Sequence, residues 1–143
     1  MVHSRLEPDG LQAFPDEAFR NHIGILGKTG SGKTTTAKGF AESLMDEGRR
    51  LCVIDPTGVW WGLRLLADGH TSGYPVVIFG GPHADLDIGE ASGARTAEII
   101  AAESFSCIVD TSAMTVGERT RFFTDFAETL LRANARPLHL VID

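Results

Sequence analysis

Residues 22–34 read HIGILGKTGSGKT, and this stretch decides how the rest of the sequence is interpreted. From Gly27 to Thr34 it matches the pattern GxxxxGK[ST] without a mismatch. Such a loop wraps consecutive backbone N–H groups around a phosphate, and glycine reaches the required backbone angles without strain. In this pattern the lysine, here Lys33, reaches the β- and γ-phosphates, and the threonine hydroxyl binds Mg²⁺. The stretch therefore predicts a site for a purine nucleoside triphosphate, ATP with Mg²⁺.

The sequence on both sides of the loop fits this prediction. The apolar run His22–Gly27 predicts a strand before the loop, and apolar residues at helical spacing from Ala37 to Met45 predict a helix after it, with Gly48 as its stop. The helix N-terminus adds free amides and a favourable dipole for an anion. The residues that we assign to nucleotide binding are consecutive: Gly27, Lys28, Thr29, Gly30, Ser31, Gly32, Lys33, Thr34 and Thr35.

Strand-like and helix-like segments alternate along the chain. The expected strands are continuous apolar runs, as for strands covered on both faces: His22–Gly27, Leu51–Asp55, Pro75–Gly80, Phe105–Asp110 and Leu138–Asp143. Further helices are expected within 58–67 and 91–103, and after a capping-box pattern at 115–118, where Phe122, Phe123, Phe126, Leu130 and Leu131 share an apolar face. The alternation predicts a three-layer α/β domain over residues 22–143 with a mostly parallel sheet, after a lead-in segment over residues 1–21.

Three of the expected strands end in aspartate: Asp55, Asp110 and Asp143. The carboxyl ends of parallel strands lie along one edge of a sheet, so all three carboxylates are expected beside the phosphate loop. A strand-end carboxylate completes the Mg²⁺ shell in this kind of site. We assign that role, together with Thr34, to Asp143, because its strand is the most uniformly apolar. Asp55 and Asp110 are then expected to position water or order their loops.

Composition restricts the possible partners. The net charge of −6 and the scattered arginines form no basic stripe, so any DNA contact must come from a local loop, a partner or an assembled ring. No run approaches the roughly 20 apolar residues that cross a bilayer, and residues 1–10 lack a signal-peptide core, which favours a cytoplasmic protein. Cys52 and Cys107 lie in apolar runs and are expected to be buried, reduced thiols.

Two adjacent aromatic residues, Trp60 and Trp61, follow the sequence Asp-Pro-Thr-Gly-Val at the expected nucleotide edge. Stacking on a base is one interpretation. Core packing or a subunit interface is favoured, because bulky aromatic side chains usually serve those ends.

The order of these segments resembles the core of HerA/FtsK-type ATPases, the DNA-pumping motors of the RecA-like (ASCE) P-loop class. The similar features are a histidine opening the first strand, the loop GKTGSGKT, a strand ending in Asp-Pro-Thr-Gly, the Asp-Thr-Ser at 110–112 and the final LHLVID. The resemblance extends from about residue 20 over nearly the whole remaining chain.

The resemblance implies ATP hydrolysis coupled to translocation of DNA or another polymer, as in a helicase, by a homo-oligomeric, hexameric ring. It implies that Lys33 is the catalytic, charge-stabilising lysine and that Thr34 and Asp143 hold Mg²⁺. Family members place a glutamate directly after the aspartate that matches Asp143, and the given sequence ends there. We therefore expect the N-terminal part of a motor domain, incomplete after the last strand, which binds Mg·ATP but hydrolyses it hardly at all.

Two other functions use the same loop. A small P-loop kinase needs an arginine-rich lid, and residues 81–93 contain no arginine. A non-hydrolysing nucleotide switch or assembly module needs only the binding loop, so the sequence leaves this alternative open.

Overall fold

Four parallel strands form the centre of the structure, a computed structural model that describes residue 17 and residues 20–65 and 69–143. In chain order they are β1 (Leu51–Asp55), β2 (Val76–Phe79), β3 (Ser106–Asp110) and β4 (His139–Ile142). Their order across the sheet is β2-β3-β1-β4. The four apolar runs after residue 50 thus form strands within a residue or two of their predicted bounds. The expected lead-in over residues 1–21 lies almost entirely outside the described residues.

Burial differs between the centre and the edge of the sheet. Every residue of β1 is buried, and only the first residue of β3 is partly exposed. In β4 the burial alternates, with Leu140 and Ile142 exposed. β4 pairs with β1, and no described strand pairs with its other side. The other edge strand, β2, is nearly fully buried, so the exposure of β4 is particular to its own edge.

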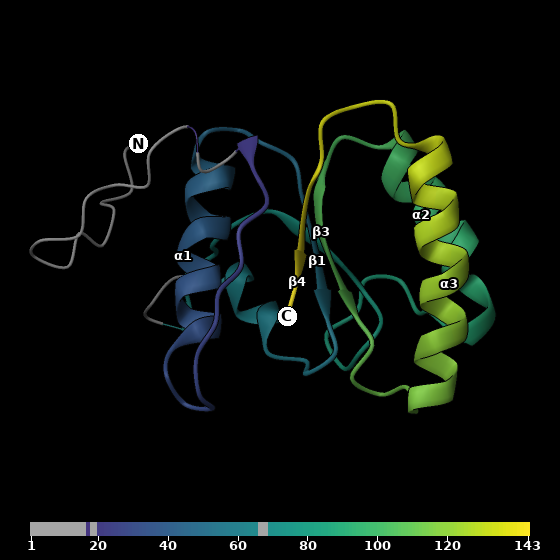
Figure 1. Cartoon of the computed structure of the whole chain (residues 1–143), viewed down its shortest axis with the longest axis horizontal. Coiled ribbons are helices and arrows are strands. Elements are labelled where there is room, and N and C mark those ends of the chain that lie inside the picture. Colours follow the sequence, from purple (N-terminus) through teal and green to yellow (C-terminus); the bar gives the residue numbers. More distant parts are fainter. Residues whose placement is uncertain (1–16, 18–19, 66–68) are drawn as a thin grey trace, which may run out of the picture.

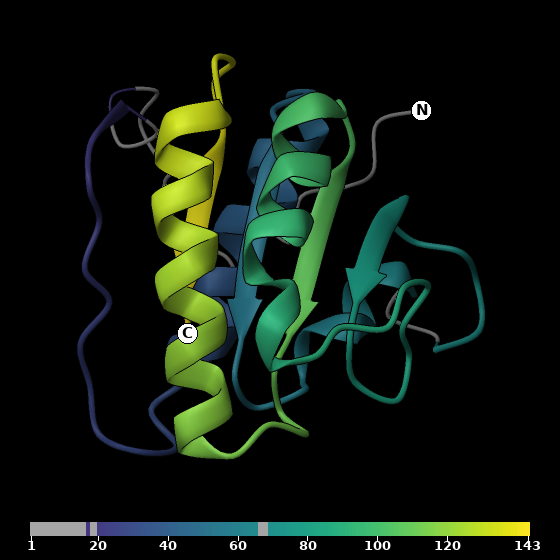
Figure 2. The same cartoon turned by 90° about the vertical axis from the view of Figure 1, so that its right-hand side faces the viewer.

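Helices cover both faces of the sheet (Figure 1). On one face lie α1 (Lys33–Asp46) and the 3₁₀ helix η2 (Trp60–Arg64), which is the helix expected within 58–67. On the other face lie α2 (Gly93–Ala102) and α3 (Val116–Ala133), which run side by side in Figure 2. The three-layer α/β architecture with a parallel sheet is confirmed. Each face has its own apolar core, because β1 and β3 direct alternate side chains to opposite sides.

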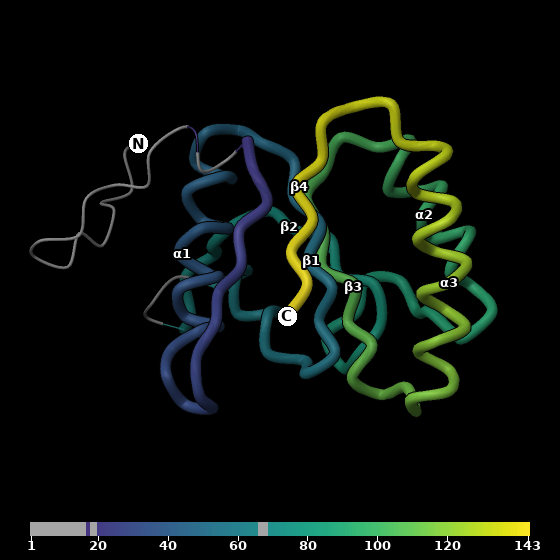
Figure 3. The backbone as a smooth tube through the Cα atoms, in the orientation of Figure 1, coloured from purple at the N-terminus to yellow at the C-terminus, as the bar shows by residue number. Residues whose placement is uncertain are grey.

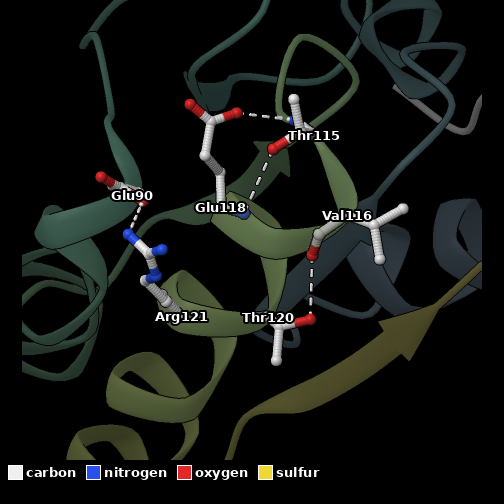
Figure 4. Close-up of polar contacts among 6 residues, drawn as sticks. All are labelled: Glu90, Thr115, Val116, Glu118, Thr120 and Arg121. Atoms are coloured by element: carbon white, nitrogen blue, oxygen red, sulfur yellow. Dashed lines mark hydrogen bonds and ion pairs between the residues drawn. The ribbon is translucent and has the colours of Figure 1, made fainter.

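α3 begins with the predicted capping box (Figure 4). The hydroxyl of Thr115 accepts a hydrogen bond from the Glu118 amide at 3.3 Å, and the Glu118 carboxylate accepts one from the Thr115 amide at 2.7 Å. The second bond lowers the pKa of Glu118. Arg121 donates to Glu90 of the short helix η3 (Glu90–Ser92) at 2.6 Å, which joins α3 to the segment before α2.

α2 and α3 pack very closely at Gly93. A Cβ atom at this position would lie 2.1 Å from the carbonyl oxygen of Phe122, so a larger residue would force the two helices apart. Phe122 is fully buried and its ring stacks on Phe126, with centroids 5.7 Å apart. The predicted apolar face of α3 is correct for these residues and wrong for Leu131, which is 86% exposed.

The expected first strand, His22–Gly27, is not formed. Residues 22–28 have no regular secondary structure and run as an extended trace, drawn in purple in Figure 3. Leu26 is 95% and Ile23 47% exposed. An apolar run predicts a tendency to be buried, but a strand needs a neighbour to supply its hydrogen bonds, and no described strand pairs with this segment.

The two cysteines lie opposite each other on β1 and β3. Cys52 and Cys107 are buried and free, as predicted, and they face each other in the strand register. The contact with Cys107 and burial raise the pKa of Cys52 well above its ordinary value, so this thiol stays protonated and unreactive.

Candidate nucleotide-binding site

The loop before α1 bends sharply at two glycines. Gly30 and Gly32 have φ angles of 79° and 86°, in the left-handed region that favours glycine. The Ser31 amide donates to the carbonyl of Lys28 at 3.1 Å and closes the turn. A Cβ on Gly27 would lie 2.4 Å from the Ser31 hydroxyl oxygen. The glycine spacing of the motif thus matches positions where the folded loop is tightly bent or tightly packed.

The N-terminus of α1 has no cap of its own. Gly32 is the N-cap residue and offers no side chain, and the first turn contains no acidic residue. The first helical hydrogen bond runs from Thr36 to the carbonyl of Gly32 at 2.9 Å. The preceding amides lie at the positive end of the helix dipole, where an anion is stabilised.

Lys33 is the first residue of α1 and folds back over the loop. Its ammonium group donates to the carbonyl of Lys28 at 3.0 Å. Residues 28–32 are exposed, and Lys33 and Thr34 are half-buried. One positive side chain therefore lies across a loop that is open to solvent. Lys28, Thr29 and Thr35 belong to the same exposed loop and helix start.

Thr34 and Asp143 are brought together from opposite ends of the described chain. The Thr34 hydroxyl oxygen lies 3.3 Å and 3.2 Å from the two carboxylate oxygens of Asp143. An ionised carboxylate accepts hydrogen bonds and donates none, so the Thr34 hydroxyl is the donor of its hydrogen bond with Asp143. Both lone pairs of the hydroxyl oxygen are then free for a cation.

These atoms fit Mg²⁺ in their chemistry. Hydroxyl and carboxylate oxygens are the ligands that Mg²⁺ prefers, and it usually takes one or two carboxylates while it keeps several waters. No group of three or more His, Cys, Asp and Glu residues that could hold a metal occurs in the described part of the chain. The pair Thr34 and Asp143 therefore suits a cation bound together with nucleotide phosphates rather than a site built by protein ligands alone.

The three strand-end aspartates lie at the same edge of the sheet, as expected. Asp55 is paired with Asp110 in the β1–β3 register, and the Asp143 amide donates to the carbonyl of Ile54 at 3.3 Å. The arrowheads of β1, β3 and β4 point to this edge in Figure 1. Their surroundings nevertheless differ, and the difference separates their roles.

Asp55 is fully buried and its carboxylate is saturated by its own loop. One oxygen accepts from the Thr57 amide at 3.0 Å, the Thr57 hydroxyl at 2.9 Å and the Gly58 amide at 2.8 Å. The other accepts from the Trp60 amide at 2.8 Å. Of the two roles left open for Asp55, the geometry favours ordering the Asp-Pro-Thr-Gly loop.

Asp110 is also buried, and one of its oxygens accepts from the Ser112 amide at 2.8 Å. Its other oxygen lies against Gly81, where an added Cβ would come within 2.0 Å of it. Asp143 alone of the three is exposed and contacts the phosphate loop helix.

Sequence reasoning missed one contact of this region. Trp60 is fully buried, and its indole N–H donates to Asp143 at 2.9 Å. The core-packing interpretation of Trp60 is correct, and burial leaves its ring unavailable for base stacking. The available signal was its place five residues after Asp55, at the edge where the strand-end carboxylates gather.

A glycine-rich loop opening a helix at the carboxyl edge of a parallel sheet defines the P-loop class of nucleotide-binding proteins. The family model described as Helicase HerA, central domain, matches residues 13–135, which is most of the chain. The chain belongs to this family, and it is a P-loop ATPase-type protein related to translocases. The match includes the whole phosphate loop and ends before β4. No curated protein and no solved structure gave a significant match.

None of the helices in the described residues combines the length and the apolar character needed to cross a membrane.

Proposed function

We propose that this chain binds Mg·ATP on the loop from Gly27 to Thr34, and that the full-length protein hydrolyses ATP, in an assembled homo-oligomeric ring, to move DNA or another polymer. One observation carries the proposal: the loop, the uncapped start of α1 and the Thr34–Asp143 pair converge on the same edge of the sheet. Family membership supports the nucleotide and the relation to translocases. The DNA and the ring extend beyond that support and rest on the resemblance, and the cytoplasmic location is an expectation from the sequence alone.

Each group has a distinct task in this scheme. The loop amides and the first amides of α1 hold the phosphate oxygens, and Lys33 leaves the Lys28 carbonyl to place its charge on the β- and γ-phosphates. Thr34 and Asp143 hold the hydrated cation. Mg²⁺, when bound, offsets charge on the phosphates. The described residues around the loop hold no group beyond Lys33 that we assign to the hydrolysis step.

The first test is Mg·ATP binding, measured by titration calorimetry, for the wild-type chain and the variant Lys33→Ala. The variant should bind at least about tenfold more weakly, or about 1.4 kcal/mol, because it loses the one side-chain charge directed at the terminal phosphates. Its thermal unfolding should be nearly unchanged, since the Lys33 ammonium group bonds to the exposed loop. Unchanged affinity in a folded variant would contradict the proposed site.

Arg95→Ala is the matched control. It removes one positive charge from the surface of α2, where Arg95 pairs with Glu98 at 3.2 Å. Its Mg·ATP affinity should equal that of the wild type, which separates local phosphate contact from a change in net charge.

The second test is phosphate release by the full-length protein with and without DNA, because the given chain is expected to hydrolyse Mg·ATP hardly at all. Release that DNA stimulates would support a translocase. Tight Mg·ATP binding without release under either condition would favour the nucleotide switch or assembly module, and binding that needs a small phosphate acceptor for turnover would favour the kinase.

A further inference from the structure

Trp60 joins two strand-end carboxylates. It is the first residue of η2 and has no exposed surface. Its backbone amide donates to Asp55 at 2.8 Å, and its indole N–H donates to Asp143 at 2.9 Å. One residue thus connects the loop after β1 with the residue after β4, which in turn contacts Thr34 at the start of α1.

The indole is held in place from several sides. Asp55 fixes the backbone of Trp60, and this carboxylate is itself held by the Thr57 and Gly58 amides. The ammonium group of Lys38 lies 5.8 Å from the centroid of the Trp60 ring, a favourable cation–π distance, and donates to the carbonyl of Val59 at 2.8 Å. A donor held this firmly directs the group that accepts from it.

The acceptor, Asp143, is by contrast exposed and lies at the end of an edge strand. Its Oδ2 atom accepts from the Trp60 indole, and both of its oxygens lie within reach of the Thr34 hydroxyl. Without the indole contact, the long hydrogen bonds from the Thr34 hydroxyl would be left to hold the carboxylate. A hydrogen bond from a buried donor to a carboxylate is of the stronger, charge-assisted kind.

We propose that Trp60 is a positioning residue: its indole N–H orients the Asp143 carboxylate so that this group and the Thr34 hydroxyl are presented together to the Mg²⁺ of a bound nucleotide. The inference rests on the proposed function and deepens it. Removing a residue that hydrogen-bonds to a metal-binding group and orients it typically weakens metal binding by about 10- to 100-fold.

Trp61 supplies a matched control next to it in the chain. It is half-buried, and its ring stacks on His83 with centroids 4.1 Å apart and planes inclined by 21°. The Trp60→Phe and Trp61→Phe variants lose the same atoms, but only the first loses the hydrogen bond to Asp143.

The experiment measures ATP affinity over a series of Mg²⁺ concentrations for the wild type and both variants. Trp60→Phe should need about tenfold more Mg²⁺ to reach half of its full ATP affinity, and excess Mg²⁺ should restore that affinity. Trp61→Phe should match the wild type. A purely structural role would lower ATP affinity at every Mg²⁺ concentration, so an effect that excess Mg²⁺ does not reverse would overturn the inference.

Fluorescence gives a second readout that does not require Trp60→Phe to fold. In Trp61→Phe the only tryptophan is Trp60, and its emission should change when Mg²⁺ is added to the ATP-bound protein, because its acceptor then faces a cation. Unchanged emission would overturn the inference. If the wild type binds Mg·ATP normally and both variants need the same Mg²⁺ concentration, only the inference about Trp60 is overturned. A wild type that binds no Mg·ATP would overturn the proposed function as well.

Discussion

The N-termini of α1 and α3 are built in opposite ways. α3 begins at a threonine whose side chain caps the helix, and Glu118 in its first turn completes the capping box. α1 begins at a glycine in the left-handed region, without a side-chain cap and without an acidic residue in its first turn. The Glu118 amide of α3 is satisfied by the protein's own Thr115 side chain, whereas the first amides of α1 have no side-chain cap and are suited to an anion.

The two helices also differ in the burial of their surroundings. α3 packs three phenylalanine rings over α2 and the sheet, and its first turn is closed by its own capping box. α1 follows an exposed loop and the exposed segment 22–27. In the proposed function the start of α1 binds the nucleotide while the α2–α3 layer stabilises the fold, so substitutions should separate the two effects.

The largest effect is expected in the stabilising layer. Phe122→Ala should lower the free energy of unfolding by about 3–5 kcal/mol, because it removes a fully buried ring from the contact between α2 and α3. Urea denaturation measures the change. Leu131→Ala on the same helix is the control and should change stability by less than about 0.5 kcal/mol, since Leu131 is 86% exposed. Equal losses in the two variants would refute the burial pattern described for α3.

A smaller effect, confined to the ligand, is expected at Asp143. Asp143→Asn should remove most of the Mg²⁺ dependence of ATP binding, about a tenfold change or 1.4 kcal/mol, because a neutral amide attracts the cation less. The measurement is ATP affinity with Mg²⁺ and with excess chelator. Asp110→Asn is the control and should keep the Mg²⁺ dependence, because Asp110 binds the Ser112 amide instead. The reverse pattern would transfer the cation role to Asp110.

The smallest effect is expected at the cap of α3. Thr115→Ala should lower the free energy of unfolding by about 1 kcal/mol, because it leaves the Glu118 amide without its acceptor. The comparison variant is Thr120→Ala, whose hydroxyl only bonds back to the Val116 carbonyl and whose loss should be neutral or slightly stabilising. Thermal unfolding of both variants measures the two stability changes. A Thr115→Ala protein as stable as Thr120→Ala would show that the cap contributes nothing to stability.

Local sequence predicted several features because their causes are local. The glycine spacing at 27–32 reflects backbone angles within one loop, and the capping box at 115–118 involves residues three positions apart. The strands after residue 50 were predicted because a buried parallel strand is a short, continuous apolar run. The same reasoning failed for His22–Gly27 and for Leu131, whose apolar character is plain but whose burial depends on what lies beside them.

The sequence by itself determined the phosphate loop, the strand–helix alternation and the three carboxylates at one sheet edge. Only the tertiary structure decided the order β2-β3-β1-β4, the saturation of Asp55 by its own loop and the meeting of Thr34, Trp60 and Asp143. The physical reason is distance along the chain. Thr34 and Trp60 lie 109 and 83 residues from Asp143, and no periodicity or spacing rule extends that far. Such contacts are fixed by how the layers pack.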